Sequence, residues 1–142
     1  MRLTQPSLLL TSEAAIKAVC AAVAAAQGMN VLINAAVVEA GGNLTAFLRC
    51  PGAALHSIGI AIDKAYTAAS FGFPTGDWSG ALGGNPGLRE RLLHVPRLMM
   101  IGGGLPIRVE GIVVGGIGVS GASEEQDLAC AEAALVAIGL EG

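Results

Sequence analysis

The polar side chains of one predicted central helix supply most of the groups that could do chemistry. These residues are His56, Asp63, Thr67 and Ser70. The last three follow His56 by 7, 11 and 14 positions, so at 3.6 residues per turn all four side chains lie within about 60° of one another around the helix axis. Lys64 runs beside this polar stripe. An imidazole near a carboxylate and an ammonium is the set that proton transfer on a small substrate uses. The stripe predicts either a catalytic face or the solvated face of an amphipathic helix.

In the catalytic interpretation, His56 is the acid/base and Asp63 or Lys64 assists it. His56 and Asp63 stand two helical turns apart, about 10 Å along the axis, so they would flank a ligand rather than bond to each other. Arg49 ends a predicted strand just before the helix and is either an exposed arginine or a clamp for a substrate carboxylate. This set predicts an isomerase, lyase or hydrolase that acts on a carboxylated catabolic intermediate.

A second group of candidate residues lies in the irregular segment after the helix. Arg89, Arg91 and His94, followed by Arg97, concentrate positive charge in a chain of net charge -3. They predict contact with an anion, such as the carboxylates of a substrate or of haem, or else surface salt bridges within an oligomer. The imidazoles of His56 and His94 are the candidate iron ligands, with methionines 99 and 100 as weaker ones.

Glycines supply the third set of candidates. Gly103 and Gly104 fit a turn, while Gly116 and Gly118 remove side chains from a strand, so that the central helix or a ligand can lie against its backbone. We expect a pocket between these glycines, the central helix and the irregular segment, with a neighbouring subunit helping to close it. Only 21 residues follow Gly121, too few for the second half of a dinucleotide-binding fold.

Composition limits the class of protein. The 142 residues fit one domain, 1–142, and a content of 53% apolar and 13% charged residues predicts a homo-oligomer, because one subunit cannot hide so much apolar surface. Eight Lys and Arg residues argue against a nucleic-acid partner. Polar residues interrupt the apolar run 18–38, and no signal-peptide core precedes it, so we expect no membrane partner and a cytoplasmic location. Three cysteines with wide spacing indicate neither disulfides nor a zinc site.

Periodicity and turn residues predict the elements that position these groups. We expect helices at 12–27 and 53–71, short helical turns near Trp78 and at 88–93, and a last helix that begins with the capping box Ser123-x-x-Gln126. Strands are expected at 31–39, 44–49, 98–101, 106–109 and 112–120. Short links between these strands predict a mainly antiparallel sheet with helices on its faces, a mixed α/β class of the α+β type.

Several sequence motifs resemble those of the GlcG/HbpS family, also called DUF336, which includes haem-degrading proteins and the C-terminal domain of PduO-type proteins. The matching stretches are 36–49, 52–53, 57–58, 61–68, 102–107 and 114–127. The chain departs from the family pattern at Glu39, where Asp is frequent, and at Cys50-Pro51, where Met-Asp is common. The resemblance implies a profilin-like or PAS-like fold, five antiparallel strands flanked by helices, in a homo-oligomer.

The resemblance also implies a function. Some members of the family bind or respond to haem, and others occur beside cobalamin-dependent or glycolate-type catabolic enzymes. The leading hypothesis is therefore a small-ligand-binding protein, with haem or a related tetrapyrrole as the ligand. The small enzyme described above and an accessory oligomeric subunit of a catabolic pathway are the alternatives.

Overall fold

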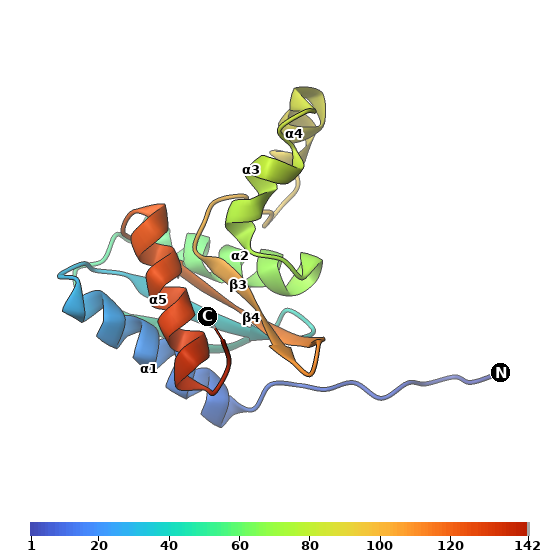
Figure 1. Cartoon of the computed structure of the whole chain (residues 1–142), viewed down its shortest axis with the longest axis horizontal. Helices are drawn as coiled ribbons and strands as arrows, with labels where there is room; N and C mark the ends of the chain where they lie inside the picture. Colours follow the sequence, from blue (N-terminus) through green and yellow to red (C-terminus); the bar gives the residue numbers. More distant parts are fainter. Residues whose placement is uncertain (142) are drawn as a thin grey trace.

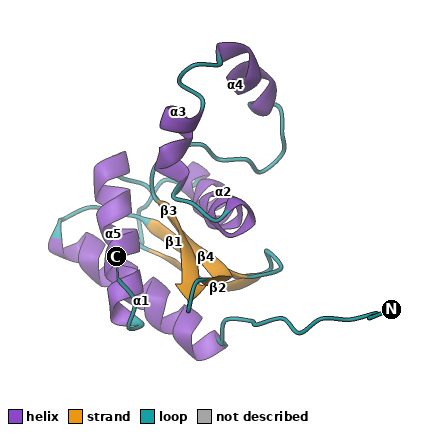
Figure 2. Cartoon of the chain, turned by 45° about the vertical axis from the view of Figure 1, so that its right-hand side comes forward, coloured by secondary structure: helices purple, strands orange, loops and turns teal. Residues whose placement is uncertain are grey.

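The fold is an open antiparallel sheet with helices on both faces, as seen in a computed structural model that describes residues 1–141 (Figures 1 and 2). The strands are ordered β2-β1-β4-β3, and each pairs antiparallel with its neighbours. The elements are α1 (Ser12–Gly28), β1 (Asn34–Glu39), β2 (Leu44–Arg49), α2 (His56–Phe71), the 3-10 turn η1 (Thr75–Asp77), α3 (Trp78–Ala81), α4 (Pro86–Leu92), β3 (Gly104–Val109), β4 (Ile112–Ser120) and α5 (Glu124–Ala137).

Strand β1 is apolar throughout because both of its faces are covered. Ala35 and Val37 belong to the larger core, under α1 and α5, whereas Ala36 and Val38 face Ala61 and other residues of α2. A strand buried on both sides has no solvent face to alternate with. The continuous apolar run in the sequence therefore marks the middle of the layered structure.

Local capping fixes the ends of the two helices that cover the larger core. The Thr11 hydroxyl accepts the Ala14 N–H at the start of α1. At the start of α5, Ser123 and Gln126 form the predicted capping box, with each side chain accepting the other's backbone N–H. The capping-box prediction is confirmed, and it sets the end of β4 against the first turn of α5.

The sheet has four strands within residues 1–141, so the prediction of five is wrong. The segment 98–101 is not a strand, since the Met99 N–H donates to the Thr67 hydroxyl of α2 instead of to a neighbouring strand. The antiparallel arrangement and the mixed α and β composition are confirmed. Helix α2 begins at His56 rather than at residue 53, because the Ala53 N–H closes a turn onto the Cys50 carbonyl.

Residues 75–101 form an arm that stands away from the sheet (Figures 1 and 2). It contains η1, α3 and α4, and none of the residues of α4 is buried. Thr75 is fully buried at the base, where its hydroxyl bonds to the Ile101 carbonyl and accepts the Gly104 N–H. One threonine thus ties the beginning of the arm to its end. Among the helices of residues 1–141, none is long and apolar enough to cross a membrane.

Candidate functional site

A cleft lies where the end of the arm folds back on α2. Its volume is about 260 Å³, and it is lined by Tyr66, Thr67, Ser70, Phe71, Val95, Pro96, Arg97 and Leu98. A smaller hollow of about 120 Å³ lies beside it, bounded by the β1–β2 turn and by Tyr66, Ala69 and Ser70. The two hollows share Tyr66 and Ser70. From here on, the cleft means the larger and the smaller hollow together.

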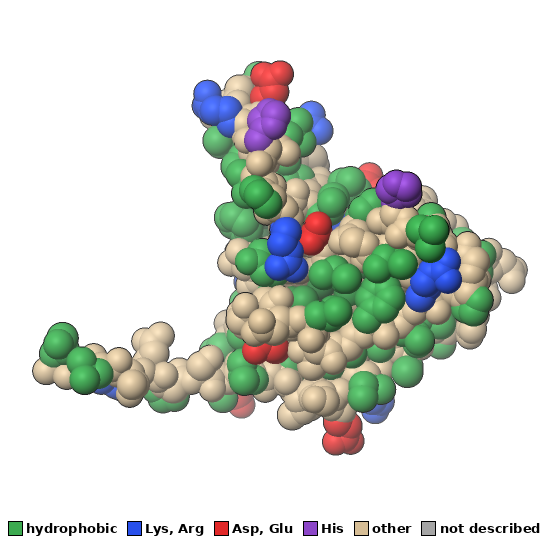
Figure 3. Space-filling model, turned by 180° about the vertical axis from the view of Figure 1, so that it is seen from behind, with side chains coloured by type: hydrophobic (Ala, Val, Ile, Leu, Met, Phe, Trp, Pro, Cys, Tyr) green, Lys and Arg blue, Asp and Glu red, His purple; other side chains and the backbone are tan. Residues whose placement is uncertain are grey.

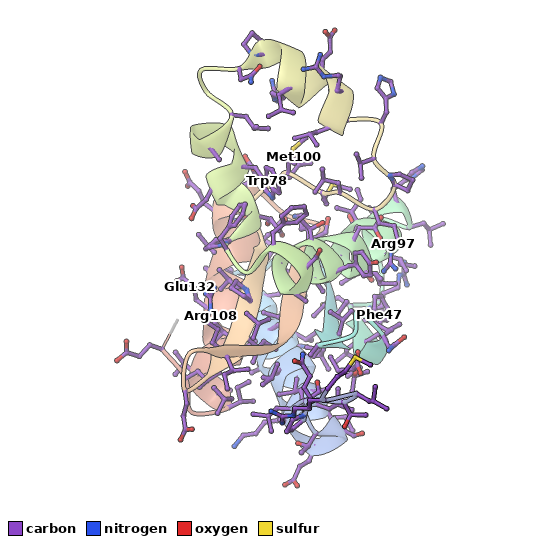
Figure 4. All side chains as sticks on the ribbon, turned by 90° about the vertical axis from the view of Figure 1, so that its right-hand side faces the viewer. Phe47, Trp78, Arg97, Met100, Arg108 and Glu132 are labelled. Atoms are coloured by element: carbon purple, nitrogen blue, oxygen red, sulfur yellow. The ribbon has the colours of Figure 1, made fainter. Side chains whose placement is uncertain are left out.

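Arg97, labelled in Figure 4, is the charged residue of the cleft. Three contacts hold it. Its Nε donates to Asp63 Oδ1 at 3.1 Å, and its guanidinium carbon lies 3.6 Å from the centre of the Tyr66 ring. Its carbonyl accepts a hydrogen bond of 2.9 Å from the hydroxyl of Thr67, which is 2% exposed. Asp63 and Thr67, both predicted site residues, therefore act on the cleft, Asp63 through Arg97 and Thr67 as part of its wall.

An aromatic cluster supports the cleft from the side of the arm. The Phe71 and Trp78 rings meet edge to face with centroids 4.8 Å apart, and Phe73 lies 5.0 Å from Trp78. Trp78 is buried at the base of the arm, whereas Phe71 is 52% exposed and lines the cleft. Edge-to-face packing of this kind fixes ring orientation. The cleft therefore has a rigid apolar wall beside its one guanidinium.

Lys64 lies away from the cleft, although it follows Asp63 in the chain. Its Nζ donates to the Val119 carbonyl at 2.9 Å and to Asp127 Oδ2 at 3.2 Å, and the side chain is 2% exposed. Burial lowers the pKa of Lys64, and the charge of Asp127 opposes that effect. Burial likewise raises the pKa of Asp127, against the charge of Lys64. This geometry joins α2 to α5 and leaves the predicted assisting ammonium without access to a ligand in the cleft.

His56 and Arg49 lie together at the start of α2 and outside the cleft. His56 is the exposed first residue of the helix. Arg49 Nη2 donates to the Ala53 carbonyl at 2.6 Å, and the Asn34 amide donates to the Ala54 carbonyl at 3.3 Å. These two bonds from neighbouring strands hold the turn that leads into α2. One donor of the predicted carboxylate clamp is therefore engaged with a backbone carbonyl oxygen.

The cationic group of the irregular segment is divided by the structure. Arg89, Arg91 and His94 are exposed on the arm, and within residues 1–141 neither arginine forms a salt bridge. Arg97 alone reaches the cleft. Figure 3 shows the two imidazoles as separate groups, one on the arm and one on the body of the molecule. The two histidines therefore do not converge on one site.

The four candidate glycines are packed against protein. A Cβ on Gly103, whose φ is +122°, would lie 2.6 Å from the Val119 carbonyl and 2.9 Å from Lys64 Nζ. Gly104 faces Thr75 in the same way. Gly116 and Gly118 face the backbone of Ala65 and Ala61 in α2. Of the two occupants left open by the sequence, the central helix fills the space at β4.

Sequence patterns provide little indication of the two residues that define the cleft. Tyr66 lies next to the polar stripe, and the matching stretch 61–68 that contains it does not mark it as a ligand-binding residue. Sequence spacing groups Arg97 with the arm arginines, yet Arg97 differs from them in its positive φ of 64° and in its contacts with residues about 30 positions earlier. Contacts across that separation have no local sequence signal. The proline before Arg97 was the one available indication of a turn.

The chain is similar to known proteins over nearly its whole length. Residues 10–136 match the family model "Haem degrading protein HbpS-like". An uncharacterized 15.0 kDa protein from the dhaT-dhaS intergenic region of Citrobacter freundii is 36% identical over 136 residues, 95% of this chain and 96% of that protein. This chain therefore belongs to the HbpS-like (DUF336) family.

Two solved structures share its fold. Klebsiella pneumoniae protein ORFY, a DUF336 protein, superposes with a TM-score of 0.92 at 32% identity, covering 99% of both chains. A structure described as a PduOC:heme complex superposes with a TM-score of 0.84 at 33% identity, covering 93% of this chain and 96% of the other.

Proposed function

We propose that this protein binds a small, largely apolar ligand with carboxylate groups in the cleft, and that the ligand is haem or a related tetrapyrrole. The observation that carries the proposal is the meeting of an apolar wall with a held guanidinium, formed by Phe71, Val95 and Leu98 around Arg97. A haem complex of a structurally similar protein supports the choice of ligand. Apolar walls with one or two placed polar groups are typical of small-molecule sites.

The cleft residues fit part of such a ligand. The larger hollow of about 260 Å³ is just below the range of about 300–1,000 Å³ that is usual for ligand pockets. A tetrapyrrole would place one edge there and extend beside Tyr66 and Ser70 into the smaller hollow or along the arm. Bound haem would supply redox-active iron. Among residues 1–141, no cluster of three His, Cys, Asp or Glu side chains is placed to hold a bare metal ion.

Three residues of this chain have distinct roles in the proposal. Tyr66 lines the cleft and is the candidate iron ligand in its wall, whereas exposed His94 is a candidate only for a porphyrin that extends along the arm beyond the lining residue Val95. Arg97 is the carboxylate partner. The enzyme alternative, with His56 as acid/base, draws no support from the geometry, because His56 lies at the far end of α2 from the cleft and Lys64 is paired with Asp127.

A haemin titration followed in the Soret region tests the proposal. We expect saturable binding by the unaltered protein and loss of binding in Ser70→Trp, which fills the shared wall of the two hollows. Ser12→Trp, at the exposed first residue of α1, is the matched control and should bind normally. Equal binding by both variants would place the ligand elsewhere. His94→Ala and His56→Ala, read by the same band, separate the two imidazoles.

We also propose that the protein is a homo-oligomer and that the arm is part of its interface. Leu93, Val95 and Ile101 are 62%, 46% and 42% exposed, and α4 buries no residue in the single chain. Fixing the backbone of each arm residue costs about 1–2 kcal/mol, which such a segment recovers only by contact with another surface. An interface on the arm would lie next to the cleft, because Val95 belongs to both.

A further inference from the structure

Arg97 has unused hydrogen-bonding capacity at the mouth of the cleft. Its Nε is occupied by Asp63, while within residues 1–141 no acceptor bonds to either of its Nη atoms. The side chain is 43% exposed. A guanidinium has five N–H donors in a fixed fork, so four of them remain available for a ligand. The arrangement leaves the bidentate edge of the group open.

The backbone of Arg97 is held in an uncommon conformation. Its φ of 64° lies in the left-handed region, which a residue with a Cβ adopts only where its surroundings impose it. The buried Thr67 hydroxyl imposes it here, because this one group donates to the Arg97 carbonyl and accepts the Met99 N–H, both at 2.9 Å. Helix α2, and not the arm alone, therefore sets the position of Arg97.

The guanidinium itself is also held in position. Its carbon lies 3.6 Å from the centre of the Tyr66 ring and its Nε donates to Asp63, so the Nη donors remain for a ligand. Asp63 is the acidic side chain that faces the guanidinium, and the other arm arginines, 89 and 91, do not line the cleft. A preorganised group of this kind loses little freedom on binding.

We infer that Arg97 is a specificity-determining residue that binds a carboxylate of the ligand bidentately through its Nη donors. Asp63 is the positioning residue, holding the guanidinium through Nε. The inference rests on the proposed function and deepens it. It requires the carboxylate edge of a tetrapyrrole to enter at Arg97, with the apolar ring against Phe71 and Leu98. A lysine would supply the charge without the fork.

Haemin and haemin dimethyl ester, in which both carboxylates are blocked, are the probes for the test. We expect the unaltered protein to prefer haemin over the ester by about 10- to 100-fold, the range for hydrogen bonds to a charged group. Arg97→Gln should lose this preference by binding haemin more weakly while the ester binds as before. Arg97→Lys should recover part of it. Arg89→Gln, on the exposed arm, is the control and should keep the full preference.

Asp63→Asn is a second variant, which retains Arg97 and removes only the charge of the carboxylate that holds its Nε. We expect an intermediate preference for haemin, because the carboxylate that holds Nε is lost while the Tyr66 and Thr67 contacts remain. Saturable binding with the same preference in Arg97→Gln as in the unaltered protein would overturn the role of Arg97 and leave the proposed function standing. An absence of saturable binding for both porphyrins in the unaltered protein would overturn both.

Discussion

Lys64 of α2 and Asp127 of α5 form a buried ion pair, with 3.2 Å between Nζ and Oδ2 and side chains that are 2% and 3% exposed. The second oxygen of Asp127 accepts the Ala122 N–H, and Lys64 also donates to the Val119 carbonyl. The pair therefore joins the helix under the cleft to the end of β4 and the start of α5. Its position gives Lys64 a structural role in joining the two helices.

Removing one partner of this pair should be costly. Lys64→Met leaves the Asp127 carboxylate buried without its partner, and we expect a loss of about 3–5 kcal/mol in the free energy of unfolding. The double variant Lys64→Met/Asp127→Leu should recover most of that loss, because burial of the two charges is itself unfavourable. Lys17→Met, on the exposed side of α1, is the matched control. Urea denaturation of all three measures the effect, and equal stability of Lys64→Met and the control would refute the assignment.

Alkaline pH should destabilise the protein through Cys130. Burial, with smaller effects from Asp127 and Cys50, raises the pKa of the Cys130 thiol from 9.0 to about 11. Between these values the folded state keeps a proton that the unfolded state has lost. The stabilisation is therefore complete below pH 9 and is lost as the pH rises through about 11, a change of about 2–3 kcal/mol.

The variant Cys130→Ala isolates this titration. Its free energy of unfolding should fall less steeply than that of the unaltered protein over the same pH window, whatever the constant cost of the smaller side chain. Cys20→Ala, which removes an exposed thiol, should retain the steep dependence. Parallel pH profiles for Cys130→Ala and the unaltered protein would contradict the prediction.

Close packing of α2 on β4 should make Gly118 irreplaceable. A Cβ there would collide with the Ala61 carbonyl and the Ala65 N–H, which are backbone groups that cannot turn aside. We expect Gly118→Ala to cost more than about 3 kcal/mol, the upper end for overpacked cores. Gly59→Ala, in the helix α2 that packs against Gly118, is the control, since a Cβ at Gly59 meets no atom within 4 Å. It should stabilise the protein by about 0.5–1 kcal/mol in thermal or urea unfolding. Similar losses in both variants would show that packing is not the cause.

The arm should control the size of the assembly. Leu93→Glu places a charge on the most exposed of the arm residues Leu93, Val95 and Ile101, and we expect the molar mass measured by light scattering to fall toward that of the monomer. Leu3→Glu changes a residue of the N-terminal segment that is 82% exposed and should leave the mass unaltered. An unchanged mass for Leu93→Glu, or a monomeric unaltered protein, would exclude the arm as the interface.

Local signals account for the parts of the fold that could be predicted. The capping box at Ser123 and the glycine turn between β1 and β2 specify their own ends, and both are found in the structure. The expected strand 98–101 failed because its backbone bonds to Thr67, which lies 32 residues before Met99. An apolar run alone cannot distinguish a strand from a segment held by a distant side chain.

In the candidate site, too, residues marked by local spacing could be predicted, whereas those that depend on distant contacts could not. Thr67 was predicted from helical spacing and lines the cleft, since the spacing identified the correct face of α2 at that point. Helical spacing places Lys64 beside the same face of α2. Its partner Asp127 lies 63 residues later, and no sequence pattern predicts that pairing. The contact between Arg97 and Tyr66 forms because the turn at the end of the arm brings Arg97 back to α2, and this contact has no local sequence signal.

Diffraction from crystals of the protein with zinc protoporphyrin IX would show whether a tetrapyrrole occupies the cleft with a carboxylate at Arg97. We expect porphyrin density against Tyr66 and Phe71 of α2, with one propionate within hydrogen-bonding distance of the Arg97 Nη atoms. Density that lies instead against the outer faces of α1 and α5, or a cleft that stays free of porphyrin at saturating concentration, would contradict this expectation.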